Sequence, residues 1–211
     1  MVKIVAIDGP ASAGKSTLAK KISDYYNSPL LNSGRLYRVI ALNIINKKIK
    51  INDKVRILNI ARSLTEDEIN SKNLFSSKID LISSKISAQK YLRDQLKEYQ
   101  RKFPKMYARN RKFAIIEGRD IGTEIFPEAN YKIFIWASAR IRAKRRYEQI
   151  KKKGQKTGLK RIYNEIIDRD TKDLNRKIAP LKPAVNSVLL DTSYLDIEQA
   201  FNAIKKILKR K

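Results

Sequence analysis

The sequence predicts an α/β fold in which a five-stranded parallel sheet is covered by helices on both faces. Five apolar runs have the length of strands, at residues 2–8, 28–31, 113–117, 131–136 and 187–191. Longer segments with the apolar spacing of helices separate them, and strands that alternate with helices favour a parallel sheet between two helical layers. The 211 residues suit one domain, and 42% of them are hydrophobic, which is enough to build a core.

Helical spacing recurs between and after these runs. The predicted helices lie at residues 15–26, 35–46, about 54–64, 74–101, 139–152, 159–175 and 195–209. Because residues 47–110 hold no convincing strand, we expect a helical insertion there, on the edge of a core formed by about 1–46 and 111–211. Two glycines among the cations of KKKGQKTG, residues 151–158, predict a flexible loop at about 150–160.

The composition excludes several kinds of chemistry. The chain has no cysteine and no histidine, which excludes disulfides, thiolate metal sites and any imidazole base or ligand. The N-terminus starts with a strand pattern rather than a leader peptide, and no apolar run approaches the roughly 18 residues of a membrane span. We therefore expect a cytoplasmic protein with no membrane partner.

The net charge of +26 has two interpretations. It would attract phosphate-bearing partners such as nucleotides, nucleic acids or anionic lipids. It would also follow from a biased base composition in the coding sequence, because the lysines are spread along the chain and accompany many isoleucines and asparagines. Charge alone therefore does not identify a partner.

The segment GPASAGKST, residues 9–17, lies between the first strand and the first helix. It matches the pattern G-x-x-x-x-G-K-[ST] in the strand-to-helix context that this pattern requires. Glycines allow successive backbone N–H groups to point inward, and the helix N-terminus adds its partial positive charge. We therefore predict a loop that binds the phosphates of a nucleoside triphosphate through Gly9, Pro10, Ala11, Ser12, Ala13, Gly14, Lys15, Ser16 and Thr17.

Three side chains of this loop have specific expected roles. Lys15 would bridge the β- and γ-phosphates, the Ser16 hydroxyl would ligate Mg²⁺, and Thr17 would lie on the α-phosphate side. A glycine-rich turn that merely caps a helix is the alternative. In either case the loop leaves the second substrate undetermined.

Two further segments place arginine beside polar groups near predicted strand ends, where open α/β sheets bind their ligands. In LNSGRLYR, Ser33 suits a helix start, and Arg38 follows about one turn into that helix. In EGRDIGT, Arg119 and Asp120 stand between two glycines directly after a strand. Because a core position explains this second pattern poorly, we expect it to contact a ligand.

A third segment, RDTKDLNR, lies in the predicted helix at 159–175 and just after it. Arg169, Asp173 and Arg176 are four and three residues apart, so they share one helical face. The alternative is a solvated face joined by ion pairs.

These segments resemble bacterial cytidylate kinases, which are nucleoside monophosphate kinases with a P-loop core. The matching stretches are GPASAGKST, LLNSGRLYRVIAL, GRDIGTEIFPEA, KIFIWASARIRAKRR and RDTKDLNRKIAPL, over roughly residues 2–46 and 82–202. Together the motifs S-G-x-x-Y-R, G-R-D-x-G-T and R-D-x-x-D-x-N-R separate this family from adenylate, thymidylate and guanylate kinases. The resemblance implies a three-layer P-loop NTPase fold and transfer of the ATP γ-phosphate to CMP or dCMP, with Mg²⁺ as the metal, in pyrimidine nucleotide metabolism.

The resemblance also implies which residues act on the transferred and acceptor phosphates. Lys15, Arg119 and Arg176 would be the catalytic residues. Arg38, Arg119 and Arg176 would clamp the acceptor phosphate, and Ser33 would contact the acceptor beside them.

For the rest of the acceptor nucleotide, the resemblance implies readers of the base and of the sugar. Ser84, Arg93 and Asp120 would read the cytosine edge, with Ser84 and Arg93 matched through ISSKISAQKYLRDQL. Arg169 and Asp173 resemble the residues on the sugar side.

On the donor side, Arg142, Arg145 and Arg146 resemble arginines that close over the ATP phosphates together with the lid loop at 150–160. The helical insertion at 47–110 would close over CMP. Closure is expected because water must be kept from the γ-phosphate.

The chain departs from the family pattern at three places. Residues 64–77 offer little strand pattern where an antiparallel hairpin usually decorates the acceptor-binding insertion. Glu117 stands where an aspartate is common, and Trp136 occupies a strand end where a smaller or polar residue is usual. For Trp136 we expect packing beside the nucleotide rather than a new specificity.

Two other functions remain open. One is a pyrimidine monophosphate kinase with relaxed base choice. The other is a nucleic-acid-binding ATPase that uses the net charge of +26, although no aromatic-studded basic surface or known nucleic-acid module is evident. The sequence decides neither the preference between CMP and dCMP, nor the activity toward UMP, nor the oligomeric state, for which we expect a monomer.

Overall fold

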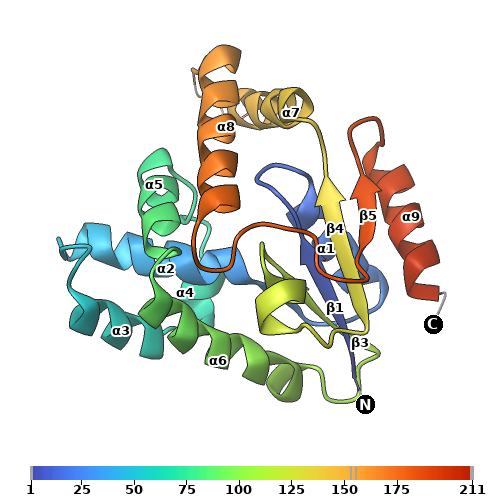
Figure 1. Ribbon diagram of the computed structural model, residues 1–211, viewed down its shortest axis with the longest axis horizontal. Coiled ribbons are helices and arrows are strands. Elements are labelled where there is room, and N and C mark those ends of the chain that lie inside the picture. The colour runs from blue at the N-terminus through green and yellow to red at the C-terminus, as the bar shows by residue number, and fades with distance from the viewer. Residues whose placement is uncertain (1, 153, 155, 210–211) are drawn as a thin grey trace. The chain divides into compact units, whose positions relative to one another are not determined.

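The computed structural model describes residues 2–152, 154 and 156–209 (Figure 1). They divide into two compact units. The sheet unit comprises the residues up to Leu30 and those from Pro104 onward, and the helical unit comprises Leu31–Phe103.

The five strands of the sheet stand in the order β2-β3-β1-β4-β5. Their bounds are Lys3–Asp8 for β1, Leu30–Asn32 for β2, Phe113–Glu117 for β3, Tyr131–Trp136 for β4 and Val188–Asp191 for β5. The pairs β1 with β3, β1 with β4 and β4 with β5 are all parallel. The predicted α/β fold with a five-stranded parallel sheet is therefore confirmed.

Burial explains why these runs form strands. Every residue of β3 is buried, and Val5, Ala6 and Ile7 of β1 are fully buried. Continuous apolar runs are typical of central strands in a parallel sheet, which is covered on both faces. The edge strand β5 is mostly exposed.

Among the described residues, the α-helices that lie wholly in the sheet unit are α1 (Lys15–Tyr25), α7 (Ala139–Lys152), α8 (Leu159–Asn175) and α9 (Ile197–Lys209). Ile22 of α1 and Ile204 of α9 are fully buried in one core with Ile115 and Ile133 of the sheet. A smaller core joins α7 to α8. All four helices lie within two residues of the predicted bounds.

The helical unit contains α2 (Ser33–Asn46), α3 (Lys54–Arg62), α4 (Glu66–Asn70), α5 (Ser77–Ile86) and most of α6 (Lys90–Tyr107). No strand occurs in the described residues 33–103, which agrees with the helical character expected there. The unit begins at Leu31 and so includes α2, whereas the predicted insertion begins at 47. The role of this unit in binding an acceptor stays a prediction.

The prediction of one helix at 74–101 is wrong. The structure has α5, which ends at Ile86, and α6, which begins at Lys90. The Ser83 and Ser87 hydroxyls donate to the backbone carbonyls of Asp80 and Ser84, and such local bonds compete with the helical ladder.

Two short elements were not predicted. The helix α4 starts with a capping box in which Thr65 and Glu68 bond each other's backbone N–H groups. The pattern T-x-x-E was visible in the sequence. The other element is a π-helical turn, η1 (Ile121–Ile125), which directly follows Asp120. None of the described helices is long and apolar enough to span a membrane.

Candidate active site

The backbone of the predicted phosphate loop requires glycine at Gly9. This residue has a φ of 144°, and a Cβ placed there would lie 1.9 Å from the carbonyl oxygen of Ile135. Gly14, with a φ of 91°, precedes α1, so the N-terminus of that helix opens toward the loop. Helix N-termini of this kind favour phosphate.

Lys15 is buried, and its Nζ donates to the carbonyl oxygen of Pro10 at 2.6 Å. The pKa of Lys15 is lowered to about 7, chiefly by burial and also by the charge of Arg119, while Glu117 and Asp8 oppose this. The buried ammonium group therefore lies near two arginines as well as two carboxylates, and an incoming phosphate would stabilise its charged form.

Two side chains outside the loop bind its carbonyl oxygens. Nη1 of Arg142 donates to Ala11 at 3.1 Å, and the Thr192 hydroxyl donates to Ala13 at 3.2 Å. These contacts come from α7 and from the end of β5, so distant parts of the sheet unit fix the loop.

Ser16 and Glu117 meet beside the loop. The Ser16 hydroxyl donates to Oε1 of Glu117 at 2.9 Å, and the Glu117 side chain is buried at the end of β3. The parallel register pairs Glu117 with Ile7, which brings the ends of β1 and β3 to the same edge of the sheet.

Asp8 was missed in the sequence, although it stands at the end of β1 just before Gly9. Its two carboxylate oxygens accept the backbone N–H groups of Ile121 at 2.8 Å and Gly122 at 2.7 Å. Burial raises the pKa of Asp8 to about 7, while these two N–H groups act in the opposite direction. Asp8 therefore holds the first residues of η1.

Four predicted acceptor residues come together in the sheet unit. Nε of Arg119 donates to Oδ2 of Asp173 at 3.1 Å. Arg176 lies 3.9 Å from Asp120 and 4.0 Å from Asp173, measured between nitrogen and oxygen. Burial alone would raise the pKa of Asp173, but Arg119, Arg169 and Arg176 hold it below its ordinary value. Asp173 is therefore ionised at neutral pH.

The arginines predicted to contact ATP already bind protein groups. Both nitrogens at the end of Arg142 pair with the carboxylate of Asp170, and its side chain is 4% exposed. Arg145 donates to the Thr192 hydroxyl at 3.2 Å. Arg146 is only partly buried.

The predicted lid loop at 150–160 falls between α7 and α8. Two of its residues, Lys153 and Gln155, lie outside the described residues. Its closing role stays a prediction. Trp136, at the end of β4, is partly exposed, and its carbonyl oxygen accepts the backbone N–H of Thr192.

The remaining predicted acceptor residues belong to the helical unit. Arg38 pairs with Asp80 and donates to the carbonyl oxygen of Leu74 at 2.9 Å. Its guanidinium lies 4.9 Å from the ring centre of Phe75, so a carboxylate, a backbone carbonyl and an aromatic ring all contact this side chain.

Ser33, Ser84 and Arg93 also lie in this unit. Ser33 is buried at the start of α2. Nη1 of Arg93 donates to the carbonyl oxygen of Ser87 at 2.8 Å, and the carbonyl oxygen of Ser84 accepts the Ser87 hydroxyl. The loop between α5 and α6 therefore orients Arg93.

Comparison with known proteins agrees with these features. The family model for cytidylate kinase matches residues 5–210. The cytidylate kinase of Bartonella tribocorum is 39% identical over 198 residues, which are 94% of this chain and 90% of the relative. That of Rhodopseudomonas palustris is 38% identical over 206 residues, which are 98% of this chain and 95% of the relative.

A solved structure shows the same fold. An uncharacterized protein from Eubacterium ventriosum superimposes with a TM-score of 0.57 at 15% identity, and the match covers 100% of both chains. At this identity the likeness concerns the fold alone. The sequence matches go further and confirm the resemblance drawn from the motifs: the chain belongs to the cytidylate kinase family.

Proposed function

We propose that this ATP-dependent nucleoside monophosphate kinase transfers the γ-phosphate of ATP to CMP or dCMP and releases ADP with CDP or dCDP. The observation that carries the proposal is the gathering of cations at one edge of the sheet. Lys15 of the phosphate loop is close enough to Arg119 for the arginine to lower its pKa. Like charges held close together are costly, and a polyphosphate between them would relieve that cost.

The proposed mechanism rests on alignment and charge neutralisation. Phosphoryl transfer needs little covalent chemistry from the protein, so a site without histidine suffices. Lys15 would bind the transferring phosphoryl group. Arg119 and Arg176 would hold the acceptor phosphate, with Arg38 as the third clamp, because their planar forks match phosphate oxygens.

Mg²⁺ fits the oxygen atoms beside the phosphate loop. The Ser16 hydroxyl and the Glu117 carboxylate lie 2.9 Å apart and are oxygen donors of the kind that Mg²⁺ prefers. The described part of the chain has no cluster of three or more acidic, histidine or cysteine side chains, so Ser16 would share the ion with nucleotide phosphates and water. The bound ion would neutralise charge on the β- and γ-phosphates.

Base choice would depend on Asp120. Its carboxylate would accept a hydrogen bond from the exocyclic amine of cytosine, whereas the corresponding carbonyl of uracil would face it as a second acceptor. A buried acceptor that is left without a hydrogen-bond donor costs about 1–3 kcal/mol of binding free energy. The side chain of Asp120 is 9% exposed, so little water would relieve that cost. Ser84 and Arg93 would read the same base edge.

Two further features belong to the proposal. The lid loop at 150–160 and the helical unit would close over ATP and CMP and keep water from the γ-phosphate. We also propose a monomeric cytoplasmic enzyme with no specific nucleic-acid partner.

A coupled assay of ADP release across CMP, dCMP, UMP, dTMP and AMP tests this function. We expect CMP or dCMP to give the highest kcat/KM. Equal turnover of UMP would contradict the role of Asp120 and favour a pyrimidine kinase with relaxed base choice. ATP hydrolysis that RNA or DNA stimulates, and that falls steeply with salt, would instead favour a nucleic-acid-dependent ATPase.

A further inference from the structure

The Arg142 side chain is buried and contacts three other parts of the chain. It extends from α7, and its Nε donates to the carbonyl oxygen of Ala137, between β4 and α7, at 2.7 Å. Its Nη1 reaches Ala11 in the phosphate loop at 3.1 Å. Nη1 and Nη2 also pair with Oδ1 and Oδ2 of Asp170 on α8, at 3.1 and 2.5 Å.

This geometry leaves Arg142 little capacity for a ligand. A guanidinium has five N–H donors in one plane, and within the described residues these contacts engage four of them. The side chain is also only 4% exposed. One N–H remains, so a bidentate phosphate contact, which needs two donors, would require the fork to leave Asp170, Ala11 or Ala137.

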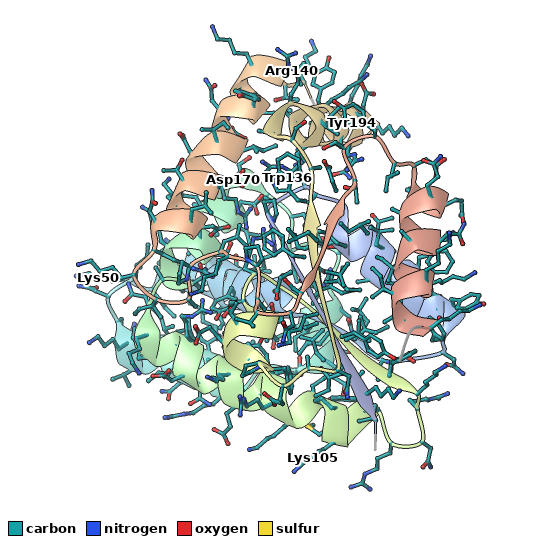
Figure 2. The ribbon with its side chains drawn as sticks, turned by 45° about the vertical axis from the view of Figure 1, so that its right-hand side comes forward. Lys50, Lys105, Trp136, Arg140, Asp170 and Tyr194 are labelled. Carbon is teal, nitrogen blue, oxygen red and sulfur yellow. The ribbon has the colours of Figure 1, made fainter. Side chains whose placement is uncertain are left out.

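Asp170 has the complementary role. Its carboxylate is 15% exposed and makes a bidentate pair, the geometry that holds a guanidinium most firmly in one plane. Figure 2 labels Asp170 on α8. Asp170 directly follows Arg169 and lies three residues before Asp173, so α8 carries both the partner of Arg142 and the predicted sugar-side residues.

We infer that Arg142 is a positioning residue for the phosphate loop, held by Asp170, rather than a ligand of the ATP phosphates. Asp170 fixes the guanidinium, and the guanidinium fixes the carbonyl group of Ala11, which sets the orientation of the neighbouring peptide in the loop. The inference rests on the proposed function only in taking ATP as the ligand of this loop.

The two roles predict opposite effects of Asp170→Asn. If Arg142 bound phosphate directly, removal of its counter-ion would free the guanidinium, and ATP would bind at least as tightly as before. If Asp170 positions Arg142, the same change loosens the loop and weakens ATP binding. Calorimetric titration with ATP, without any acceptor, measures this difference.

We expect Asp170→Asn and Arg142→Met each to raise the Kd for ATP about tenfold, a change equivalent to about 1.4 kcal/mol. Because the two residues act as one unit, the double variant should be no weaker than either single variant. Arg142→Lys should resemble Arg142→Met, since an ammonium lacks the planar fork. An unchanged or lower Kd in Asp170→Asn, or additive losses in the double variant, would overturn the inference.

Two matched controls separate positioning from general destabilisation. Arg140→Met on α7 and Asp168→Asn on α8 remove the same charges from exposed positions two residues away, and should leave the Kd for ATP unchanged. Arg140 is labelled in Figure 2.

Steady-state kinetics with CMP gives a second measurement. Positioning predicts that the KM for ATP rises while kcat stays within about twofold of the wild-type value. Failure of the wild-type chain to phosphorylate CMP would contradict the proposed function, but the ATP titrations would still decide the role of Arg142. Arg142→Lys keeps the buried positive charge. It replaces Arg142→Met in these measurements if Arg142→Met lowers the melting temperature so far that the protein does not stay folded.

Discussion

Arg119 donates from Nε to Oδ2 of Asp173 at 3.1 Å, across 54 positions of the sequence. This contact joins the end of β3 to the last turn of α8. The guanidinium proposed to hold the acceptor phosphate is therefore oriented by a carboxylate before any nucleotide binds.

Arg119→Ala should lower kcat/KM for CMP by about 100-fold or more, because preorganised charge is the main contribution to phosphoryl transfer. ATP binding should change much less. Arg111→Ala, which removes an exposed arginine just before β3, is the matched control and should retain full activity. The coupled assay and an ATP titration measure both quantities, and near-normal turnover of Arg119→Ala would show that the charge is placed elsewhere.

Asp120→Asn should reduce the preference for CMP over UMP by about tenfold or more. The amide would offer a donor to the uracil carbonyl and so remove the repulsion between two acceptors. Competition between CMP and UMP in one reaction gives the ratio of their kcat/KM values directly. The same ratio in wild type and variant would assign base recognition to another residue.

Gly9→Ala should abolish ATP binding. The new Cβ would lie 1.9 Å from the carbonyl oxygen of Ile135, which belongs to the backbone of β4. Thermal melting with and without ATP checks this, and an unchanged ATP-dependent stabilisation in Gly9→Ala would contradict it.

Local sequence signals predicted the sheet and the phosphate loop well. The apolar runs of β1 and β3 are continuous because both strands are buried in the sheet, and the loop motif lies within nine consecutive residues. Between α5 and α6, the apolar spacing favoured a continuous helix, whereas serines such as Ser87 favour a helix end. Because the prediction used the spacing alone, it gave one helix where the structure has two.

The supporting contacts of the site could not be predicted in the same way. Asp8 meets Ile121 across 113 positions, and Arg142 meets Asp170 across 28. No local pattern records such pairs, since they depend on how the elements pack. Hence the sequence motifs placed Arg142 in the candidate site, and only the structure shows which groups its guanidinium contacts.

The charge of Asp173 predicts how stability depends on pH. Burial alone would raise its pKa, yet Arg119, Arg169 and Arg176 keep it below the ordinary value of 3.8. A depressed pKa means that the folded state binds the proton less readily than the unfolded state. The pairing therefore stabilises the fold above that ordinary value, and the stabilisation is lost as the pH falls through the lower pKa of the folded state.

Asp173→Asn should accordingly lower the melting temperature at pH 7, because it leaves the partly buried guanidiniums without their shared carboxylate. The difference from wild type should shrink below about pH 4, where the unfolded wild-type chain begins to take up a proton that the folded state still excludes. Asp168→Asn, at an exposed position of the same helix, should show a small difference that varies little with pH. Melting curves from pH 7 to pH 3 test this, and a deficit in Asp173→Asn that persists undiminished at pH 3 would mean that packing, not charge, explains its effect.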